Sequence, residues 1–220
     1  MNAGYGKIAP MPDFSLEIAA AQAGRTRVAG IDEAGRGPWA GPVVAAAVVL
    51  DVAVVPAGLL NGLDDSKRLS RTRREVLFSA MGREVGVSIG LGQATVAEIG
   101  RFNILGATLR AMARAVVALD VAPDLALVDG TQAPILPCAV ECVVRGDSRS
   151  LSISAASIAA KITRDRIMAD LAAQHPGYGW ERNAGYGTIE HQDALERLGA
   201  TPHHRRSFKP IIKILGQHSR

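Results

Sequence analysis

The chain has 220 residues, 48% of them hydrophobic, which excludes a disordered or collagen-like protein and is enough for one sizeable core. Its 25 basic and 21 acidic residues leave a net charge of only +4, a weak overall signal for a nucleic-acid partner. Residues up to about 24 lack the charged start and apolar stretch of a signal peptide, and Asp51 and Pro56 interrupt the most membrane-like stretch, residues 43–60. We expect a cytoplasmic protein without a membrane span, with residues 1–24 as an N-terminal tail and residues 25–220 as a single domain.

Periodic apolar patterns predict the order of the secondary structure. Expected strands lie near residues 27–32, 42–50, 84–93, 125–128 and 139–144. Helices are expected from about 103 to 119 and from about 152 to 173, and a small region from about 175 mixes short helices with loops. Strands followed by helix–strand alternation predict an α/β fold with a mixed central sheet flanked by helices.

The two cysteines, Cys138 and Cys142, lie four residues apart in an expected strand. Their separation on one face of a strand would be about 13 Å, too far for a disulfide. No neighbouring Cys or His spacing indicates zinc. We therefore expect two reduced structural thiols.

Two adjacent acids, Asp32 and Glu33, follow an apolar run that ends at Ile31, and a glycine-rich loop comes next. Adjacent carboxylates repel each other, and the loop glycines add backbone entropy that folding must overcome. Metal binding would offset the repulsion. A solvated turn with incidental acids is the alternative for such a pair taken alone.

Several short blocks accompany this pair, and their joint order is more specific than any one of them. They are Gly30-Ile31-Asp32-Glu33-Ala34-Gly35-Arg36-Gly37-Pro38, Asp65-Ser66-Lys67-Arg68-Leu69-Ser70, Phe102-Asn103-Ile104-Leu105, Val128-Asp129-Gly130, Gly146-Asp147, Ala155-Ala156-Ser157-Ile158-Ala159-Ala160-Lys161, Arg164-Asp165, Gly185-Tyr186-Gly187-Thr188 and His204-Arg205-Arg206-Ser207-Phe208. Over roughly residues 26–210 the chain resembles ribonuclease HII, the type 2 branch of the ribonuclease H family.

The resemblance implies a ribonuclease H-like fold and an endonuclease that hydrolyses the RNA strand of RNA–DNA hybrids. It also implies cleavage on the 5′ side of single ribonucleotides embedded in duplex DNA, leaving 3′-hydroxyl and 5′-phosphate ends, and thus a part in ribonucleotide excision repair. Two divalent ions per site, Mn²⁺ or Mg²⁺, and a monomer are expected. The alternatives are a related nuclease such as the ribonuclease HIII branch, which the absence of a large extra N-terminal domain disfavours, and a non-catalytic hybrid-binding module.

Four carboxylates are the expected catalytic and metal-binding residues. Asp32 and Glu33 supply the first pair, and Asp129 ends a strand, at the edge of the sheet where α/β proteins bind ligands. Asp147 could cap the long helix, but the resemblance implies that it is the fourth ligand. Asp165 is its rival, which we interpret as a structural ion-pair partner beside Arg164 and Arg166.

Recognition of the ribose is expected at a second group of residues. Glycines bring bare backbone close to a sugar, and the 2′-hydroxyl is what distinguishes RNA from DNA. The resemblance implies that the main chain of Gly35-Arg36-Gly37 contacts this hydroxyl together with Tyr186; the alternative for Tyr186 is a half-buried core residue. The family commonly has a lysine before Gly-Tyr-Gly, where this chain has Ala184, so one phosphate contact is in doubt.

Backbone contacts are expected from four further residues: Lys67, Asn103, Ser157 and Lys161. The last two belong to a polar stripe, with Ser154 and Arg164, that recurs at helical spacing. Two basic clusters, around residues 68–74 and 203–209, also suit phosphates, although a solvated helix face is the commoner explanation for either.

Two other chemistries are disfavoured. Ser157 and Lys161 could form a nucleophilic dyad, but nothing else in the sequence supports acyl transfer. His191, His203 and His204 are not expected as ligands, because the carboxylates already satisfy the metals.

Overall fold

The computed structural model describes residues 11–217. Five strands form one sheet in the order β3-β2-β1-β4-β5, with bounds β1 (Val28–Ala34), β2 (Val43–Leu50), β3 (Val87–Ala94), β4 (Leu125–Asp129) and β5 (Ala139–Val143). β1 and β3 run antiparallel to β2, whereas β1, β4 and β5 run parallel to one another. The mixed sheet predicted from the sequence is confirmed.

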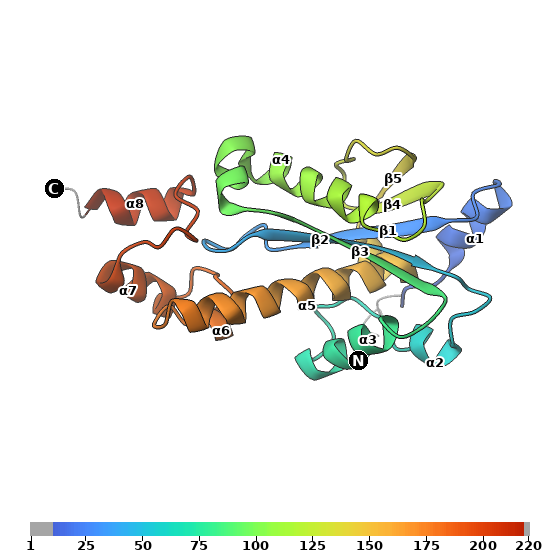
Figure 1. The fold of residues 1–220 in the computed structure, drawn as a ribbon, viewed down its shortest axis with the longest axis horizontal. Coiled ribbons are helices and arrows are strands. Elements are labelled where there is room, and N and C mark those ends of the chain that lie inside the picture. Colours follow the sequence, from blue (N-terminus) through green and yellow to red (C-terminus); the bar gives the residue numbers. More distant parts are fainter. Residues whose placement is uncertain (1–10, 218–220) are drawn as a thin grey trace, which may run out of the picture.

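Two long helices cover opposite faces of this sheet, α4 (Val96–Val117) and α5 (Leu151–Gln174) (Figure 1). The alternation of strand side chains supplies an apolar surface to each: on β2, Ala45 packs in the cluster on the α4 side and Val48 in that on the α5 side. Gly30 on β1 allows α5 to approach closely, since a Cβ there would lie 2.0 Å from the Ser152 carbonyl carbon. The close approach fixes α5 directly behind β1.

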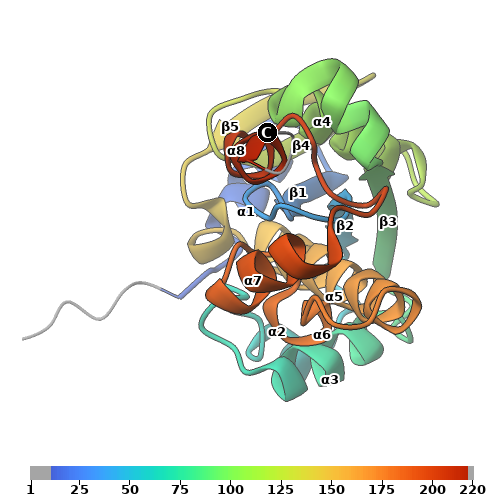
Figure 2. The same ribbon diagram turned by 90° about the vertical axis from the view of Figure 1, so that its left-hand side faces the viewer.

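The shorter helices are α1 (Ser15–Gln22), α2 (Ala57–Leu60), α3 (Arg71–Met81), the 3₁₀ turn η1 (Gly146–Ser148), α6 (Trp180–Asn183), α7 (Ile189–Leu198) and α8 (Lys209–Gln217). The helices α6 to α8 gather at one end of the molecule and α1 lies at the other (Figures 1 and 2). Trp180, Leu195 and Ile211 form the core of the C-terminal region with the end of α5. The expected mixture of short helices and loops after about residue 175 is confirmed.

The start of the first long helix differs from the sequence prediction. The first long helix begins at residue 96, not 103, because Thr95 and Glu98 form a reciprocal capping box at its start. Asn103, the expected start, instead interrupts the helix with a φ of 56°, and its side chain accepts hydrogen bonds from the N–H groups of Leu105 and Gly106. Residues 96–102 therefore form a helical segment before the kink, and the apolar pattern did not predict this segment.

Part of the expected tail is structured. Within residues 1–24, helix α1 contains the buried Glu17, whose Oε1 accepts hydrogen bonds from Ser150 and Ser152 at the start of α5. Residues 1–10 lie outside the described part of the chain. The segment around α1 thus packs on the sheet-and-helix core.

Cys138 and Cys142 are both free and half-buried, which confirms that they form no disulfide. Within residues 11–217, no helix has the length and hydrophobicity needed to cross a membrane.

Candidate active site

Asp32 and Asp129 meet at the edge of the sheet because their strands are parallel neighbours. In the register of β1 and β4, Ile31 pairs with Val128, so the next residue on each strand is an aspartate. The Asp32 side chain is buried and accepts a hydrogen bond from the Glu33 N–H at 2.6 Å. The parallel register therefore brings together two carboxylates that lie almost a hundred residues apart in the sequence.

The electrostatics of these acids are unfavourable in the chain alone. Burial, reinforced by repulsion from Glu33 and Asp129, holds the pKa of Asp32 well above its usual range. Burial also raises the pKa of Glu33, although Arg36, whose Nη1 lies 3.2 Å from Glu33 Oε1, opposes the shift. Burial is again the main reason that the pKa of Asp129 is raised. The site concentrates negative charge that the protein compensates only in part.

Asp147 lies in η1, directly after Gly146, whose backbone is hydrogen-bonded to Asp129. The N–H of Gly146 donates to Asp129 Oδ1 at 2.7 Å, and Asp147 itself is buried. Helix α5 is capped by Ser150, whose hydroxyl accepts from the Ile153 N–H, so Asp147 is not its cap. Instead, Asp147 Oδ2 accepts from Lys67 Nζ at 3.1 Å. The capping alternative weighed from the sequence is wrong.

Lys67 bridges two acids with a mostly exposed side chain. Its Nζ lies 3.1 Å from Asp147 and 3.8 Å from Asp65. Partial burial opposes its charge, but the hydrogen bond and attraction to Asp147 outweigh burial, so the pKa of Lys67 is raised. Lys67 thus remains a cation at the margin of the acidic site.

The carboxylates of the site fit divalent ions that take only part of their ligands from the protein and the rest from water and substrate. Within the described residues 11–217, no group of three or more His, Cys, Asp or Glu side chains is close enough to hold one ion. Mg²⁺ and ions like it are usually held by one or two carboxylates, with waters and substrate phosphates completing the shell. The partly uncompensated charge of Asp32, Glu33 and Asp129 suits such cations.

A cavity of about 340 Å³ opens over the acids. Its lining includes Asp32, Glu33, Ala34, Gly35, Arg36, Gly37, Ser66, Lys67, Arg74, Asp129, Ser157, Lys161, Arg164 and Tyr186. Five separate segments of the chain therefore contribute polar side chains to one concave surface, which also contains the expected glycine turn.

Tyr186 stands beside the glycine turn with about half of its surface exposed. A Cβ on Gly37 would lie 3.4 Å from the Tyr186 ring, so the bare backbone of Gly37 faces that ring. Tyr186 is one of the residues that line the cavity, and its exposure is also that of the half-buried core residue considered as the alternative. Tyrosine and turn form one wall of the cavity.

The polar stripe of α5 does not face the cavity as a unit. Ser157 lies near enough to Asp32 to lower the pKa of that carboxyl, and its Oγ is 2.6 Å from Ser66 Oγ. Lys161 pairs with Asp165 at 2.6 Å, so Asp165 is the ion-pair partner inferred from the sequence, although of a different residue from Arg164 or Arg166. Ser154 is buried and donates to the Asp64 carbonyl.

Some expected contact residues lie elsewhere. Asn103, at the kink of α4, is not part of the cavity lining, and neither is Asp147. The prediction that the basic cluster at residues 203–209 forms one phosphate-binding patch is wrong, because His204 and Arg205 are each only 1% exposed. Ser66 and Arg74, for which no individual role was expected from the sequence, also line the cavity. Ser66 lies in the loop before α3, and Arg74 lies in α3 itself and donates to the Ser66 carbonyl.

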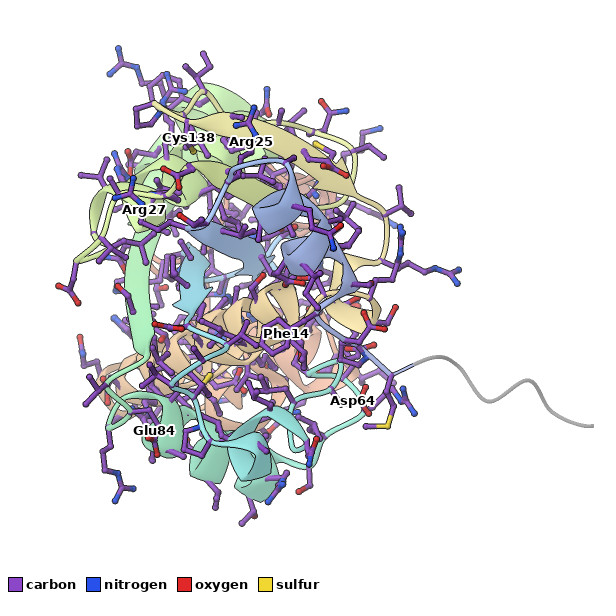
Figure 3. All side chains as sticks on the ribbon, turned by 90° about the vertical axis from the view of Figure 1, so that its right-hand side faces the viewer. Phe14, Arg25, Arg27, Asp64, Glu84 and Cys138 are labelled. Atoms are coloured by element: carbon purple, nitrogen blue, oxygen red, sulfur yellow. The ribbon has the colours of Figure 1, made fainter. Side chains whose placement is uncertain are left out.

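A larger cavity lies at the end of the molecule where α1 packs, the end that Figure 3 shows. Its volume is about 700 Å³, and its lining is mostly apolar, with Val49, Val52 and Val85 beside Glu17 and Arg27. It contains no counterpart of the paired carboxylates of β1 and β4. Size alone therefore does not identify the site.

The fold and acidic site define a ribonuclease H-like nuclease, and comparison with known proteins gives the family. The sequence model of the family described as Ribonuclease HII matches residues 29–211. A ribonuclease HII of Ruegeria pomeroyi is 56% identical over 99% of this chain and 91% of its own length. The chain belongs to the ribonuclease HII family, whose members are divalent-metal-dependent endoribonucleases that act on RNA–DNA hybrids.

Solved structures agree with this assignment. The ribonuclease H2 of Pyrococcus horikoshii superimposes with a TM-score of 0.72 at 26% identity, over 88% of this chain and 99% of that one. A Bst ribonuclease HIII in complex with Mn²⁺ shares the fold, with a TM-score of 0.71 at 20% identity, over 91% of this chain and 72% of that one. The predicted ribonuclease H-like fold is confirmed.

Proposed function

We propose that this chain cuts on the 5′ side of single ribonucleotides in duplex DNA, as well as within RNA–DNA hybrids, and uses two divalent ions. The products would be 3′-hydroxyl and 5′-phosphate ends. One observation carries the proposal: the acids of β1 and β4, of which Asp32 is buried and Glu33 and Asp129 are half-buried, share a cavity with a bare glycine turn and a half-exposed tyrosine. A metal-binding acidic centre thus lies beside a surface suited to a ribose.

Asp32, Glu33, Asp129 and Asp147 would hold the ions, Mg²⁺ or Mn²⁺. When bound, two such ions lower the pKa of the attacking water and stabilise the leaving 3′ oxygen. The role of the chain is to present its carboxylates already desolvated and mutually repelling, a state that cations relieve. Mn²⁺ bound to the Bst ribonuclease HIII, which has the same fold, supports the choice of ion.

The ribose would be recognised by Gly35-Arg36-Gly37 and Tyr186. The Tyr186 ring can stack on a sugar while its phenol hydrogen-bonds, and the backbone of Gly37 lies against that ring. A deoxyribose offers no 2′-hydroxyl to these groups, which supports discrimination at a single nucleotide. The turn and the tyrosine would therefore act together.

The phosphate backbone would be bound by cations and polar groups around the cavity. Lys67 and Lys161 line it, and Ser157 lies between Asp32 and Ser66. Asn103, outside the cavity on α4, would contact the backbone further along the duplex. All these residues and the four acids belong to one chain, so we propose that a monomer is active.

The second candidate function is a non-catalytic module that binds hybrids. The acids argue against it, since a binding surface for a polyanion gains nothing from buried, mutually repelling carboxylates. Product mapping on a DNA duplex with one ribonucleotide, with and without Mg²⁺ or Mn²⁺, distinguishes the two. We expect one metal-dependent cut 5′ of the ribonucleotide; binding without any cut would contradict the proposal.

A further inference from the structure

Two buried arginines lie behind the glycine turn and donate only to backbone carbonyls. Arg205 and Arg164 are each 1% exposed, and neither forms an ion pair within residues 11–217. Burial lowers the pKa of Arg205 to about 9 and that of Arg164 to about 10, so both stay charged at neutral pH. A buried charge is expensive unless hydrogen bonds satisfy it, which shows how closely the surrounding carbonyls must fit.

Arg205 bonds both sides of the turn that joins β1 to β2. Its Nη2 donates to the carbonyls of Gly35 at 2.6 Å and Pro42 at 3.2 Å, and its Nη1 donates to that of Arg36 at 2.9 Å. Its Nε donates to the carbonyl of Gly41 at 3.0 Å. One guanidinium thus closes the loop from residue 35 to residue 42.

Arg164 connects the same loop to the turn that carries Tyr186. It donates to the carbonyls of Pro42 at 3.0 Å, Ala40 at 3.1 Å and Ala184 at 2.9 Å. The Arg164 side chain also lies so close to Gly35 that a Cβ there would be 2.0 Å from its Nε. The two turns, residues 35–42 and 184–187, are therefore held together by Arg164 of α5 and Arg205 of the C-terminal region; we call this arrangement the arginine frame.

Peptide geometry gives this frame a chemical consequence. Every peptide bond in the described part of the chain is trans, so the C=O and N–H of one unit point in opposite directions. By holding the carbonyls of Gly35 and Arg36, Arg205 turns the following N–H groups, those of Arg36 and Gly37, away from itself. Neither N–H has a hydrogen-bond acceptor among residues 11–217.

We propose that Arg205, together with Arg164, is a positioning residue that orients the main-chain N–H groups of Arg36 and Gly37 towards the ribose. This inference rests on the proposed recognition of ribose by that turn. Arg205 touches neither substrate nor metal; it acts through the two peptide units. Two adjacent, unpaired and rigidly held donors recognise an oxygen of the nucleotide better than a loop that must order itself on binding.

The decisive variant is Arg205→Lys, which keeps the charge but cannot reach four carbonyls with one ammonium. We expect cleavage of a duplex with one ribonucleotide to fall about tenfold more than cleavage of a continuous hybrid, measured as kcat/KM at temperatures well below unfolding. Met112→Ala is the matched control, because Met112 is a buried core residue on the opposite face of the sheet. It should lower stability and leave the ratio between substrates unchanged.

Hydrogen exchange of the peptide covering residues 35–42 provides a readout independent of activity. We expect faster exchange there in Arg205→Lys and no local change in Met112→Ala. Equal losses on both substrates, or wild-type exchange in Arg205→Lys, would overturn the positioning role. If Arg205→Lys does not fold, Arg164→Lys tests the same frame with the same two measurements. If the wild-type enzyme does not cut at a single ribonucleotide, the proposed function is wrong. The hydrogen exchange of residues 35–42 would then still show whether Arg205 holds the turn.

Discussion

The molecule contains two polar clusters, one half-buried and acidic and one buried and rich in histidine, whose polar groups find their partners in different ways. One is the acidic cluster of Asp32, Glu33 and Asp129. The other lies in the C-terminal region, where His191 Nε2 is 3.1 Å from both Trp180 Nε1 and His204 Nε2. The Thr201 N–H donates to His204 Nδ1, so the proton of His204 must be on Nε2, where it donates to His191.

The proton positions of the second cluster are thereby determined. The single lone pair of His191 Nε2 faces both the indole N–H and the His204 N–H, which leaves the Nδ1–H of His191 to donate to the Tyr186 carbonyl at 2.9 Å. Every ring nitrogen of the pair has a partner while both rings are neutral. The histidine cluster completes itself within the chain and supports Tyr186, whereas the acidic cluster carries charge that Arg36 and Lys67 compensate only in part. Buried polarity thus stabilises one region and prepares the other for a ligand.

The largest expected effect concerns the acidic cluster. Asp129→Asn should abolish cleavage, by roughly a thousandfold or more, because an amide keeps the shape of the carboxylate without the charge that holds an ion. Folding and affinity for hybrid should be nearly unchanged. Initial rates in saturating Mg²⁺, together with hybrid binding, are the measurement.

Asp165→Asn is the matched control for Asp129→Asn. Asp165 pairs with Lys161 on the surface of α5, so its loss should lower stability more than turnover. Activity near wild type in Asp129→Asn would remove Asp129 from the ligand set. An inactive Asp165→Asn beside an active Asp147→Asn would show that the fourth ligand is Asp165.

The next effect concerns Tyr186, which lines the cavity over the acids and whose carbonyl is bonded to His191. Tyr186→Ala should lose most cleavage at an isolated ribonucleotide and less on long hybrids, where several registers and backbone contacts remain. Tyr186→Phe should lose one hydrogen bond, about 0.5–1.5 kcal/mol or roughly a few-fold to tenfold. Neither variant should cut all-DNA duplex. Equal losses on both substrates with a lower melting temperature would make Tyr186 a structural residue.

Acid should weaken the histidine cluster. Burial, with repulsion from His191, lowers the pKa of His204 to about 3, and burial also lowers the pKa of His191. The unfolded chain therefore binds more protons below about pH 6.5, and stability falls with pH between roughly 6.5 and 3, by up to about 1.4 kcal/mol per pH unit for His204. Denaturant unfolding at several pH values measures the slope.

His204→Gln is the comparison for this slope. It should be less stable at pH 7 but lose less stability on acidification. The acids of the site act in the opposite sense, because their raised pKa values mean that the folded chain retains protons above the unfolded values near 4. A wild-type slope equal to that of His204→Gln would contradict the assignment of neutral rings.

Removing one acid should stabilise the metal-free protein. Asp32→Asn keeps the oxygen that accepts from the Glu33 N–H but relieves repulsion and the burial of a charge. In a chelator we expect a melting temperature about 2–4 °C above wild type, as for a gain of about 1 kcal/mol. Added Mn²⁺ should raise the melting temperature of wild type and not that of the variant. A lower melting temperature in chelator would mean that the acids are satisfied by the chain itself.

The smallest effect is expected at the edge of the acidic cluster. Lys67→Ala should weaken all nucleic-acid substrates similarly and reduce the slope of log affinity against log salt by about one. Titrations of hybrid and duplex at several salt concentrations measure both quantities. A changed cleavage position with unchanged affinity would contradict a phosphate contact.

The sequence by itself determined the sheet, its two covering helices and the acids at its edge. Apolar periodicity identified the strands, and a strand must deliver the residue at its end to the edge of the sheet, which is why Asp32 and Asp129 could be chosen before the register was known. The family blocks then added Asp147 and Tyr186, for which local pattern alone favoured other roles. The roles of these residues stay predictions until the variants are measured.

Only the tertiary structure decided which polar residues face inward. The basic cluster at residues 203–209 has the composition of a phosphate-binding patch, yet Arg205 is buried and bonded to carbonyls of residues 35–42. Likewise, Arg164 belongs to a polar stripe on α5 and borders the cavity, yet it is buried and its guanidinium donates to the carbonyls of Ala40, Pro42 and Ala184. Helical spacing shows which residues share a face, but the partners of a long arginine come from segments far away in the chain, and these meet only when the sheet, α5 and the C-terminal helices have packed.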